Sequence, residues 1–165
     1  MTFSNIADFS AAGALWPWLF PSIYLLHIAE EFWGGEGYSA HIAKTKGVSL
    51  TSPRFFFLTG LGCLLMIAGI AIAERLHFSQ LLLVILGTVV LINSLSHSIT
   101  AVRTARYNPG LWTGILFWIP LGVLTLLRLK GSMSGSRFLT GLAIGAGVQV
   151  AASLLSMSGG KISEA

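Results

Sequence analysis

The chain is a series of long apolar runs separated by short polar connections. A bilayer has a hydrocarbon core about 30 Å thick, and a helix needs about 20 apolar residues to cross it. Runs close to that length cover residues 14–33, 55–73, 81–103, 111–127 and 138–157. They predict an all-α protein, a polytopic membrane helix bundle of about five transmembrane helices, with residues 1–165 forming a single domain.

Composition leads to the same class of protein. Hydrophobic residues make up 54% of the chain and charged residues only 10%, whereas about a quarter of the residues of a soluble domain are charged. The ten basic residues are scattered through the connections and form no stripe, so a nucleic-acid partner is not expected. The expected partner is the lipid bilayer, and the composition leaves room for a homo-oligomer. The lone Cys63 cannot form an intrachain disulfide.

The distribution of positive charge predicts an orientation. Lys44, Lys46 and Arg54 follow the first apolar run, while the N-terminal tail carries no Lys or Arg. Cytoplasmic connections are enriched in Lys and Arg, so the first connection is predicted to be cytoplasmic and the N-terminus outside. The tail also lacks the basic segment of a cleaved signal peptide, so the first run is expected to remain as a span.

Ionisable residues stand at the C-terminal end of the first run, in HIAEEFW (27–33). His27, Glu30 and Glu31 occupy positions i, i+3 and i+4 and therefore share one helical face. In the third run, Asn93 and His97 share a face at i and i+4. The first and third spans run in the same direction, so the two polar faces lie at similar depth. They are expected to form one site if the helices are neighbours.

Divalent metal binding would explain these residues. An ionised acid near the bilayer centre costs about 2.5 to 3.5 kcal/mol, and two adjacent carboxylates also repel each other. A cation bound by imidazole nitrogen and carboxylate oxygen relieves both costs, and zinc or iron suits these ligands. The candidate metal ligands are His27, Glu30, Glu31 and His97.

Three motifs together resemble the HXXEE family of small bacterial membrane proteins. They are HIAEE at 27–31, the Asn93-x-x-x-His97 pair and YNPG at 107–110, and the resemblance covers roughly residues 20–125. It implies a shared site that also includes Tyr107, Asn108 and Pro109, and a location in the bacterial inner (cytoplasmic) membrane. It implies no particular reaction.

The third motif also has a physical interpretation. Asn-Pro-Gly after a helix forms a stiff turn, which would hold the Tyr107 hydroxyl beside the mouth of the site as a hydrogen-bond donor. The candidate catalytic residues are Glu30 as general base, Tyr107 to orient a substrate or stabilise an oxyanion, and Asn93 beside them.

Three function classes fit these residues. The first is an intramembrane metal-dependent enzyme acting on a lipid-soluble substrate, in which zinc implies hydrolysis and iron implies oxidation. The second is a metal-free acid–base isomerase or cyclase of an isoprenoid-like lipid. The third is a small ion- or proton-coupled transporter, although the chain shows no inverted repeat. An assembly or scaffold role completes the alternatives. No dinucleotide or phosphate-loop fingerprint is present, so no cofactor besides a metal is expected.

Simpler structural roles compete with the site. The two glutamates can mark the interfacial end of the first helix, with Arg103 or Arg106 as partners. The second polar pair can serve as a hydrogen-bonded helix contact. His41 is expected in a solvated polar loop, Gln149 in an interhelical hydrogen bond, and Trp118 in packing or an aromatic belt.

Small residues in the last run predict close helix packing. Gly141 and Gly145 are four residues apart and therefore lie on one face of the predicted helix.

Overall fold

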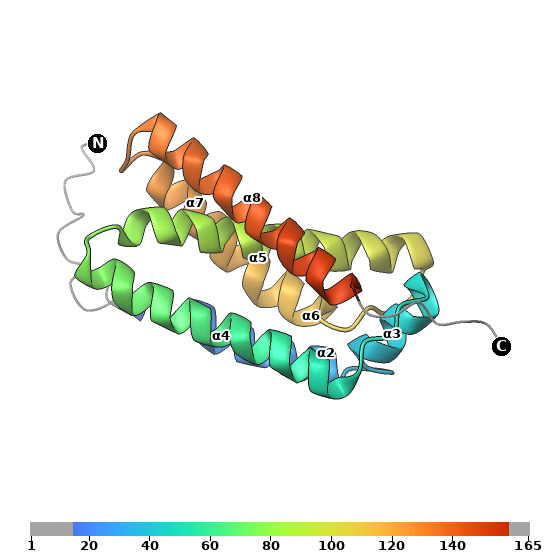
Figure 1. Ribbon diagram of the computed structural model, residues 1–165. Coiled ribbons are helices and arrows are strands. Elements are labelled where there is room, and N and C mark those ends of the chain that lie inside the picture. The colour runs from blue at the N-terminus through green and yellow to red at the C-terminus, as the bar shows by residue number, and fades with distance from the viewer. Residues whose placement is uncertain (1–14, 159–165) are drawn as a thin grey trace.

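All the regular elements that the structure describes are helices. The computed structural model describes residues 15–158. In chain order the elements are α2 (Leu19–Trp33), α3 (Tyr38–Lys46), α4 (Ser52–Arg75), α5 (Ser79–Thr104), α6 (Leu111–Thr113), the π-helix η1 (Gly114–Trp118), α7 (Ile119–Lys130) and α8 (Gly135–Met157) (Figure 1). The predicted all-α fold is confirmed.

The protein is an integral membrane protein. Four continuous helical segments are long and apolar enough to cross a bilayer: Ser52–Arg75, Ser79–Thr104, Leu111–Lys130 and Gly135–Met157. They contain the last four predicted runs. The fifth apolar helix, α2, has 15 residues, which corresponds to about 22 Å and is shorter than the hydrocarbon core. The first predicted run began at residue 14, which lies outside the described residues.

Helix α5 is the centre of the bundle. It packs against α4, η1, α7 and α8. Figure 1 shows that α2, α5 and α8 run towards the end of the bundle where α3 lies, and that α4 and α7 run back. The C-terminal ends of α2 and α5 therefore lie at the same end, as the predicted site requires.

Helix α8 approaches α5 closely because glycines face it. A Cβ atom at Gly145 would lie 2.7 Å from the Ile85 carbonyl oxygen, and one at Gly141 would lie 2.6 Å from the Val84 side chain. Any larger residue would push the helices apart. The predicted packing role of these two glycines is confirmed.

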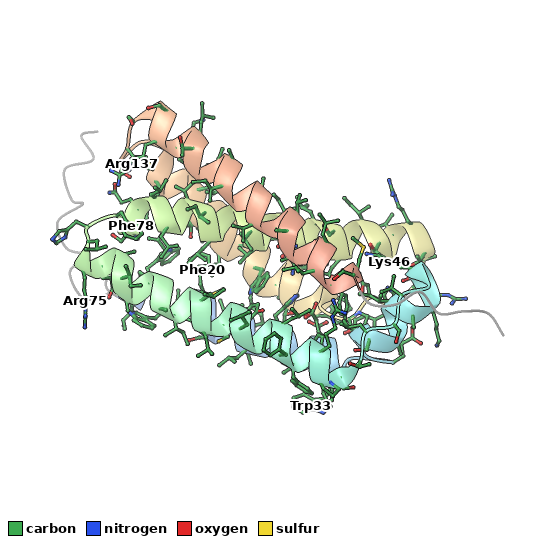
Figure 2. The ribbon with its side chains drawn as sticks, viewed as in Figure 1. Phe20, Trp33, Lys46, Arg75, Phe78 and Arg137 are labelled. Atoms are coloured by element: carbon green, nitrogen blue, oxygen red, sulfur yellow. The ribbon has the colours of Figure 1, made fainter. Side chains whose placement is uncertain are left out.

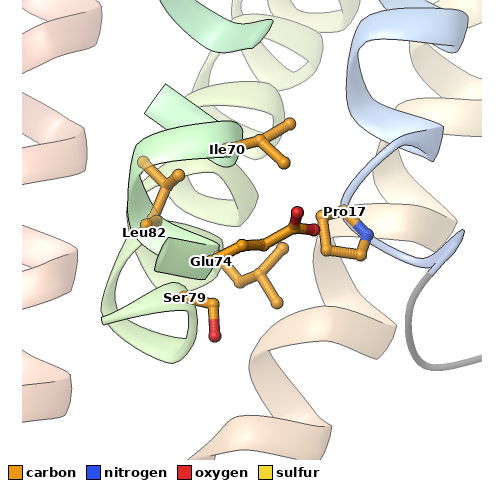
Figure 3. A pocket seen from close by; sticks show the side chains of 7 residues that line it. Pro17, Ile70, Glu74, Ser79 and Leu82 are labelled. Carbon is orange, nitrogen blue, oxygen red and sulfur yellow. The ribbon is translucent and has the colours of Figure 1, made fainter. Parts of the chain in front are cut away.

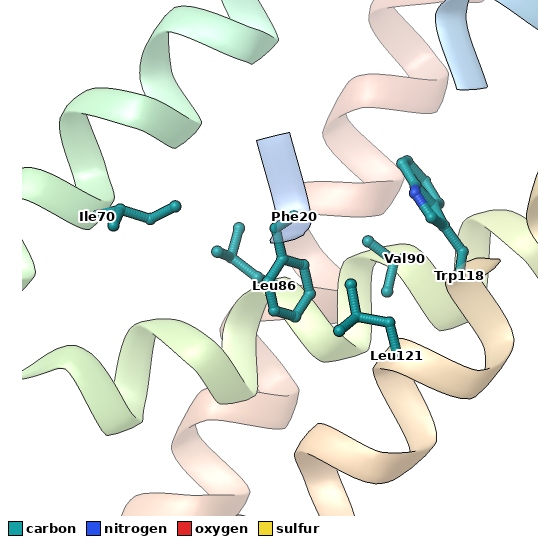
Figure 4. Close-up of a cluster of buried hydrophobic side chains, with 6 residues drawn as sticks. All are labelled: Phe20, Ile70, Leu86, Val90, Trp118 and Leu121. Carbon is teal, nitrogen blue, oxygen red and sulfur yellow. The ribbon is translucent and has the colours of Figure 1, made fainter. Parts of the chain in front are cut away.

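Two apolar clusters hold the bundle together. The larger one joins α2, α4, α5, η1 and α7 through Phe20, Ile70, Leu86, Val90, Trp118 and Leu121 (Figure 4). The smaller one, made of Ile42, Leu50 and Phe55, fastens α3 to the start of α4.

The two ends of the bundle differ. Figure 2 labels Arg75 and Phe78 at one end and Trp33 and Lys46 at the other. A hollow near the first end is lined by Pro17, Ile70, Glu74, Ser79 and Leu82 among others (Figure 3), but it has no room for a water molecule. This hollow therefore carries no ligand site.

The connection between the first two runs is not the solvated polar loop that the sequence suggested. It contains α3, which is bounded by Gly37 and Gly47, both with positive φ. Within α3, Ile42 is fully buried and His41 is 5% exposed. The prediction for His41 was wrong because this side chain shares the apolar face of α3, which packs onto the bundle.

Candidate metal centre

Helices α2 and α5 bring three of the four predicted ligands together. His27 and Glu31 lie one turn apart on α2, and His97 faces them from α5. Glu31 Oε1 lies 3.6 Å from His27 Nε2 and 3.4 Å from His97 Nε2. All three ligand atoms lie within 4.8 Å of one another, and all three residues are buried. Together these residues can hold a metal ion.

The distances from the Glu31 carboxylate oxygen to the two imidazoles are those of ligands around an ion. Hydrogen bonds between nitrogen and oxygen are about 2.7 to 3.2 Å long, and both contacts of Glu31 Oε1, at 3.6 and 3.4 Å, are longer. A tetrahedral ion with ligands at about 2.0 to 2.1 Å has ligand atoms about 3.4 Å apart. The carboxylate oxygen thus stands at ligand spacing from both imidazoles.

His27 is oriented by a chain of hydrogen bonds on its Nδ1 side. The Thr113 hydroxyl lies 2.5 Å from Glu30 Oε2 and 2.7 Å from His27 Nδ1. The carboxylate only accepts, so the hydroxyl donates to it and accepts from His27 Nδ1–H. Neutral His27 therefore carries its proton on Nδ1, which leaves the Nε2 lone pair able to accept a hydrogen bond or bind an ion. This is the tautomer that a metal-binding histidine needs.

The Nε2 side of His27 also meets an amide. Asn93 Nδ2 lies 3.0 Å from His27 Nε2 and donates to its lone pair. Gln149 Nε2 in turn donates to Asn93 Oδ1 over 3.2 Å, which fixes the amide's orientation. The predicted interhelical role of Gln149 is confirmed. An ion bound at His27 Nε2 would replace the Asn93 hydrogen bond.

Glu30 binds the start of α6 rather than the group of His27, Glu31 and His97. Its carboxylate accepts hydrogen bonds from the Tyr107 hydroxyl at 2.7 Å, the Trp112 N–H at 2.9 Å and the Thr113 N–H at 2.7 Å. First-turn amides of a helix have no partner within the helix, and a carboxylate is a favourable partner for them. Glu30 therefore reaches His27 only through Thr113.

The two glutamates are more than the polar end of a helix. Glu31 is 8% exposed, and among the described residues neither glutamate forms an ion pair with Arg103 or Arg106. Their partners are the histidines and the start of α6. The ion pairs with Arg103 or Arg106 that the interfacial interpretation expected are therefore not formed among the described residues.

The YNPG motif forms the turn that the sequence predicts. Asn108 donates through Nδ2 to the His97 carbonyl at 3.2 Å, and residues 108–110 are buried. Burial and the hydrogen bond to Glu30 raise the pKa of Tyr107. The Tyr107 hydroxyl therefore keeps its proton and remains a donor.

Gly110 has no side chain, and this makes room for the imidazoles of His27 and His97. Its φ is 91°, a conformation that favours glycine. A Cβ atom there would lie 2.8 Å from His27 Cε1 and 2.9 Å from His97 Cε1. The glycine of the motif is thus required both by the turn and by the ligands beside it.

A π-helix supplies the aromatic wall of the centre. Trp118, at the end of η1, stacks on His27 with ring centroids 4.2 Å apart. Pro120 follows and has no N–H for the Leu116 carbonyl, so the wider π turn fits it. The predicted packing role of Trp118 is confirmed, and its packing partner is the site itself. Sequence reasoning missed Thr113, because no pattern links it to a histidine 86 residues away.

Helix α3 packs beside the candidate centre. The Tyr38 ring lies 5.9 Å from that of His97, and His41 Nδ1 lies 3.7 Å from Glu36 Oε1. The hydrogen bond from Lys44 lowers the pKa of Glu36, and burial lowers the pKa of His41. His41 is therefore neutral at pH 7, and α3 adds no positive charge beside the cluster through this residue.

Residues 18–125 match a family model described as "Protein of unknown function with HXXEE motif". The chain belongs to the HXXEE family. The match contains the HXXEE motif at His27, Glu30 and Glu31 and also the partners of that motif in α5 and α6, whereas Gln149 lies beyond it. No curated protein and no solved structure matches the chain.

Replacing Gly110 by alanine should loosen the HXXEE site. The positive φ of this position, 91°, would cost roughly 1 to 2 kcal/mol of unfolding free energy in any L residue. Displacing the two imidazoles should add about 1 to 3 kcal/mol. The control is Gly47→Ala, which also has a positive φ (63°) but no atom within 4 Å of the added Cβ. Unfolding in mixed detergent micelles measures both variants, and equal losses would contradict the account.

Proposed function

We propose that this HXXEE protein is an intramembrane metal-dependent enzyme, a hydrolase or an oxidoreductase, that acts on a lipid-soluble substrate. The observation that carries the proposal is the convergence of His27 Nε2, His97 Nε2 and Glu31 Oε1, with the carboxylate oxygen 3.6 and 3.4 Å from the two nitrogens. Buried ionisable residues in a membrane bundle mark functional sites, and a bound cation would offset the cost of burying the carboxylate.

The ligand set narrows the chemistry. Two histidines and one carboxylate bind the zinc of several hydrolases and the iron of many oxygenases, and in both they leave positions for water or substrate. A bound ion would supply a Lewis acid and, if it is iron, a redox centre. The metal's identity therefore separates hydrolysis from oxidation.

The surrounding residues have separate tasks in this proposal. Thr113 and Glu30 hold His27 in the tautomer that offers Nε2. Glu30 also lies 2.7 Å from the Tyr107 hydroxyl, so these two groups can take and give a proton at a substrate bound beside them. The substrate is lipid-soluble because the bundle that surrounds the site lies in the bilayer.

One observation favours a second candidate, the metal-free acid–base isomerase or cyclase. Asn93 donates to His27 Nε2 over 3.0 Å and satisfies that nitrogen without any ion. Glu30, Thr113, His27 and Asn93 then form one continuous hydrogen-bonded chain, which suits proton transfer. Metal content distinguishes the two candidates.

Elemental analysis of the protein purified in mild detergent is the test. The wild type should carry about one zinc or iron per chain, and His27→Ala, His97→Ala and Glu31→Gln should each lose it, because each removes a ligand of the ion. Glu30→Gln should retain the metal with an affinity lowered about 10- to 100-fold, since it touches His27 only through Thr113. His77→Asn is the control, an exposed histidine in the turn between α4 and α5.

Stoichiometric metal in both histidine variants would refute the ligand assignment. Equal metal loss in Glu30→Gln and Glu31→Gln would make both carboxylates ligands and favour a two-metal centre. A wild type without metal that still converts a lipid would favour the metal-free candidate.

We also propose that the protein lies in a bacterial inner membrane with the α3 end of the bundle in the cytoplasm. Lys44, Lys46 and Arg54 lie in or beside α3 at that end, and cytoplasmic connections are enriched in such residues.

Cysteine labelling in intact cells checks this orientation. In a Cys63→Ala background, Lys44→Cys should react with a membrane-impermeant maleimide only after the cells are opened. Arg137→Cys, at the opposite end, should react in intact cells. The reversed pattern would reverse the orientation.

A further inference from the structure

An open groove lies between the C-terminal end of α5 and the start of the α6–η1 segment. Its volume is about 440 Å³, within the range of small-molecule sites. The walls are mainly apolar and include Val102, Trp112 and Ile115, all of them exposed. The polar residues of the lining are Ser98, Arg106 and Tyr107. In Figure 1 this part of the bundle lies at the same end as α3.

The groove shares its wall with the candidate metal centre. Tyr107 and Trp112 both line it, and both donate to Glu30 Oε1, at 2.7 and 2.9 Å. Glu30 thus lies directly behind the groove wall. A molecule in the groove would lie beside the two groups to which the proposed function assigns proton transfer.

Arg106 places a positive charge in the groove. Among the described residues no carboxylate lies within 4 Å of its guanidinium. The nearby acid, Glu36, pairs closely with Lys44 and interacts with Arg106 only at longer range. Arg106 follows the last turn of α5, at the level where a membrane helix ends and lipid headgroups begin. A guanidinium in this position is complementary to an anionic headgroup.

We propose that the groove binds one membrane-dissolved amphiphile whose phosphate or carboxylate head contacts Arg106. The first carbons of its chain then lie between Val102 of α5 and Trp112 of α6. The head then lies next to Tyr107, so the atoms that react are those close to the head. This inference rests on the proposed function for its chemical role, but binding itself needs no metal. The substrate class is therefore an anionic lipid rather than a neutral one.

Binding of hexadecyl phosphate to the full-length protein in phosphatidylcholine nanodiscs tests the proposal. In the presence of a chelator, the wild type should bind it saturably, with about one molecule per chain. Arg106→Gln should weaken binding about ten-fold or more, because it removes a charge-assisted contact. Arg103→Gln is the matched control, because Arg103 lies three residues earlier, is also exposed and is outside the groove. It should change affinity by less than about two-fold.

A groove-filling variant and competing ligands test where the lipid binds and which part of it is recognised. Val102→Trp should block binding by filling the groove, and hexadecanol should bind more weakly than hexadecyl phosphate. Inorganic phosphate should not displace the lipid, because the chain supplies part of the affinity. Equal weakening in Arg106→Gln and Arg103→Gln would reduce the effect to general surface charge and overturn the proposal. Displacement by inorganic phosphate would overturn it as well.

The variant His27→Ala separates this inference from the metal proposal. It should lose metal and still bind hexadecyl phosphate with wild-type affinity. A wild type that holds metal but binds no lipid would end the groove proposal and leave the metal centre standing. A wild type that binds the lipid but holds no metal would do the reverse.

Discussion

The structure depends most on how the carboxylate of Glu31 is accommodated inside an apolar bundle. Removing such a charge from water costs several kcal/mol unless compensating charge lies beside it. Here two imidazole nitrogens lie at 3.6 and 3.4 Å, which is too far for strong hydrogen bonds and well suited to a shared cation. Gly110, which has no side chain, leaves room for the two imidazoles. Trp118 stacks on His27 and holds its ring in place. The adjacent Glu30 has a different role, because its carboxylate accepts hydrogen bonds from the N–H groups at the start of α6.

The route from this centre to the membrane runs through the YNPG turn. Residues 107–110 close over the histidines on one side and present Tyr107 to an outer groove on the other. The helix that begins after the turn supplies both the amides that bind Glu30 and the hydroxyl that orients His27. One short motif thus connects the candidate ligands, the pair proposed for proton transfer and the outer groove.

Much of this arrangement could be predicted from the sequence. Apolar runs of about 20 residues define spans, and helical periodicity puts His27 over Glu31 and Asn93 over His97. Because the first and third spans run in the same direction, both pairs were expected at a similar depth in the membrane. The same periodicity could not separate the tasks of Glu30 and Glu31, because these depend on α6, some 80 residues further along the chain. Thr113 was missed for this reason. His41 was wrongly predicted, because α3 is too short for a clear apolar period and is buried only by contact with the bundle.

X-ray absorption at the edge of the bound metal tests the central claim most directly. We expect two imidazole nitrogens at about 2.0 to 2.1 Å and one carboxylate oxygen at about 2.0 to 2.2 Å, with the multiple scattering typical of histidine rings. In His97→Ala the imidazole contribution should fall by half in any metal that remains. A shell made only of oxygen, or one in which His97→Ala leaves the spectrum unchanged, would contradict a centre built from His27, Glu31 and His97.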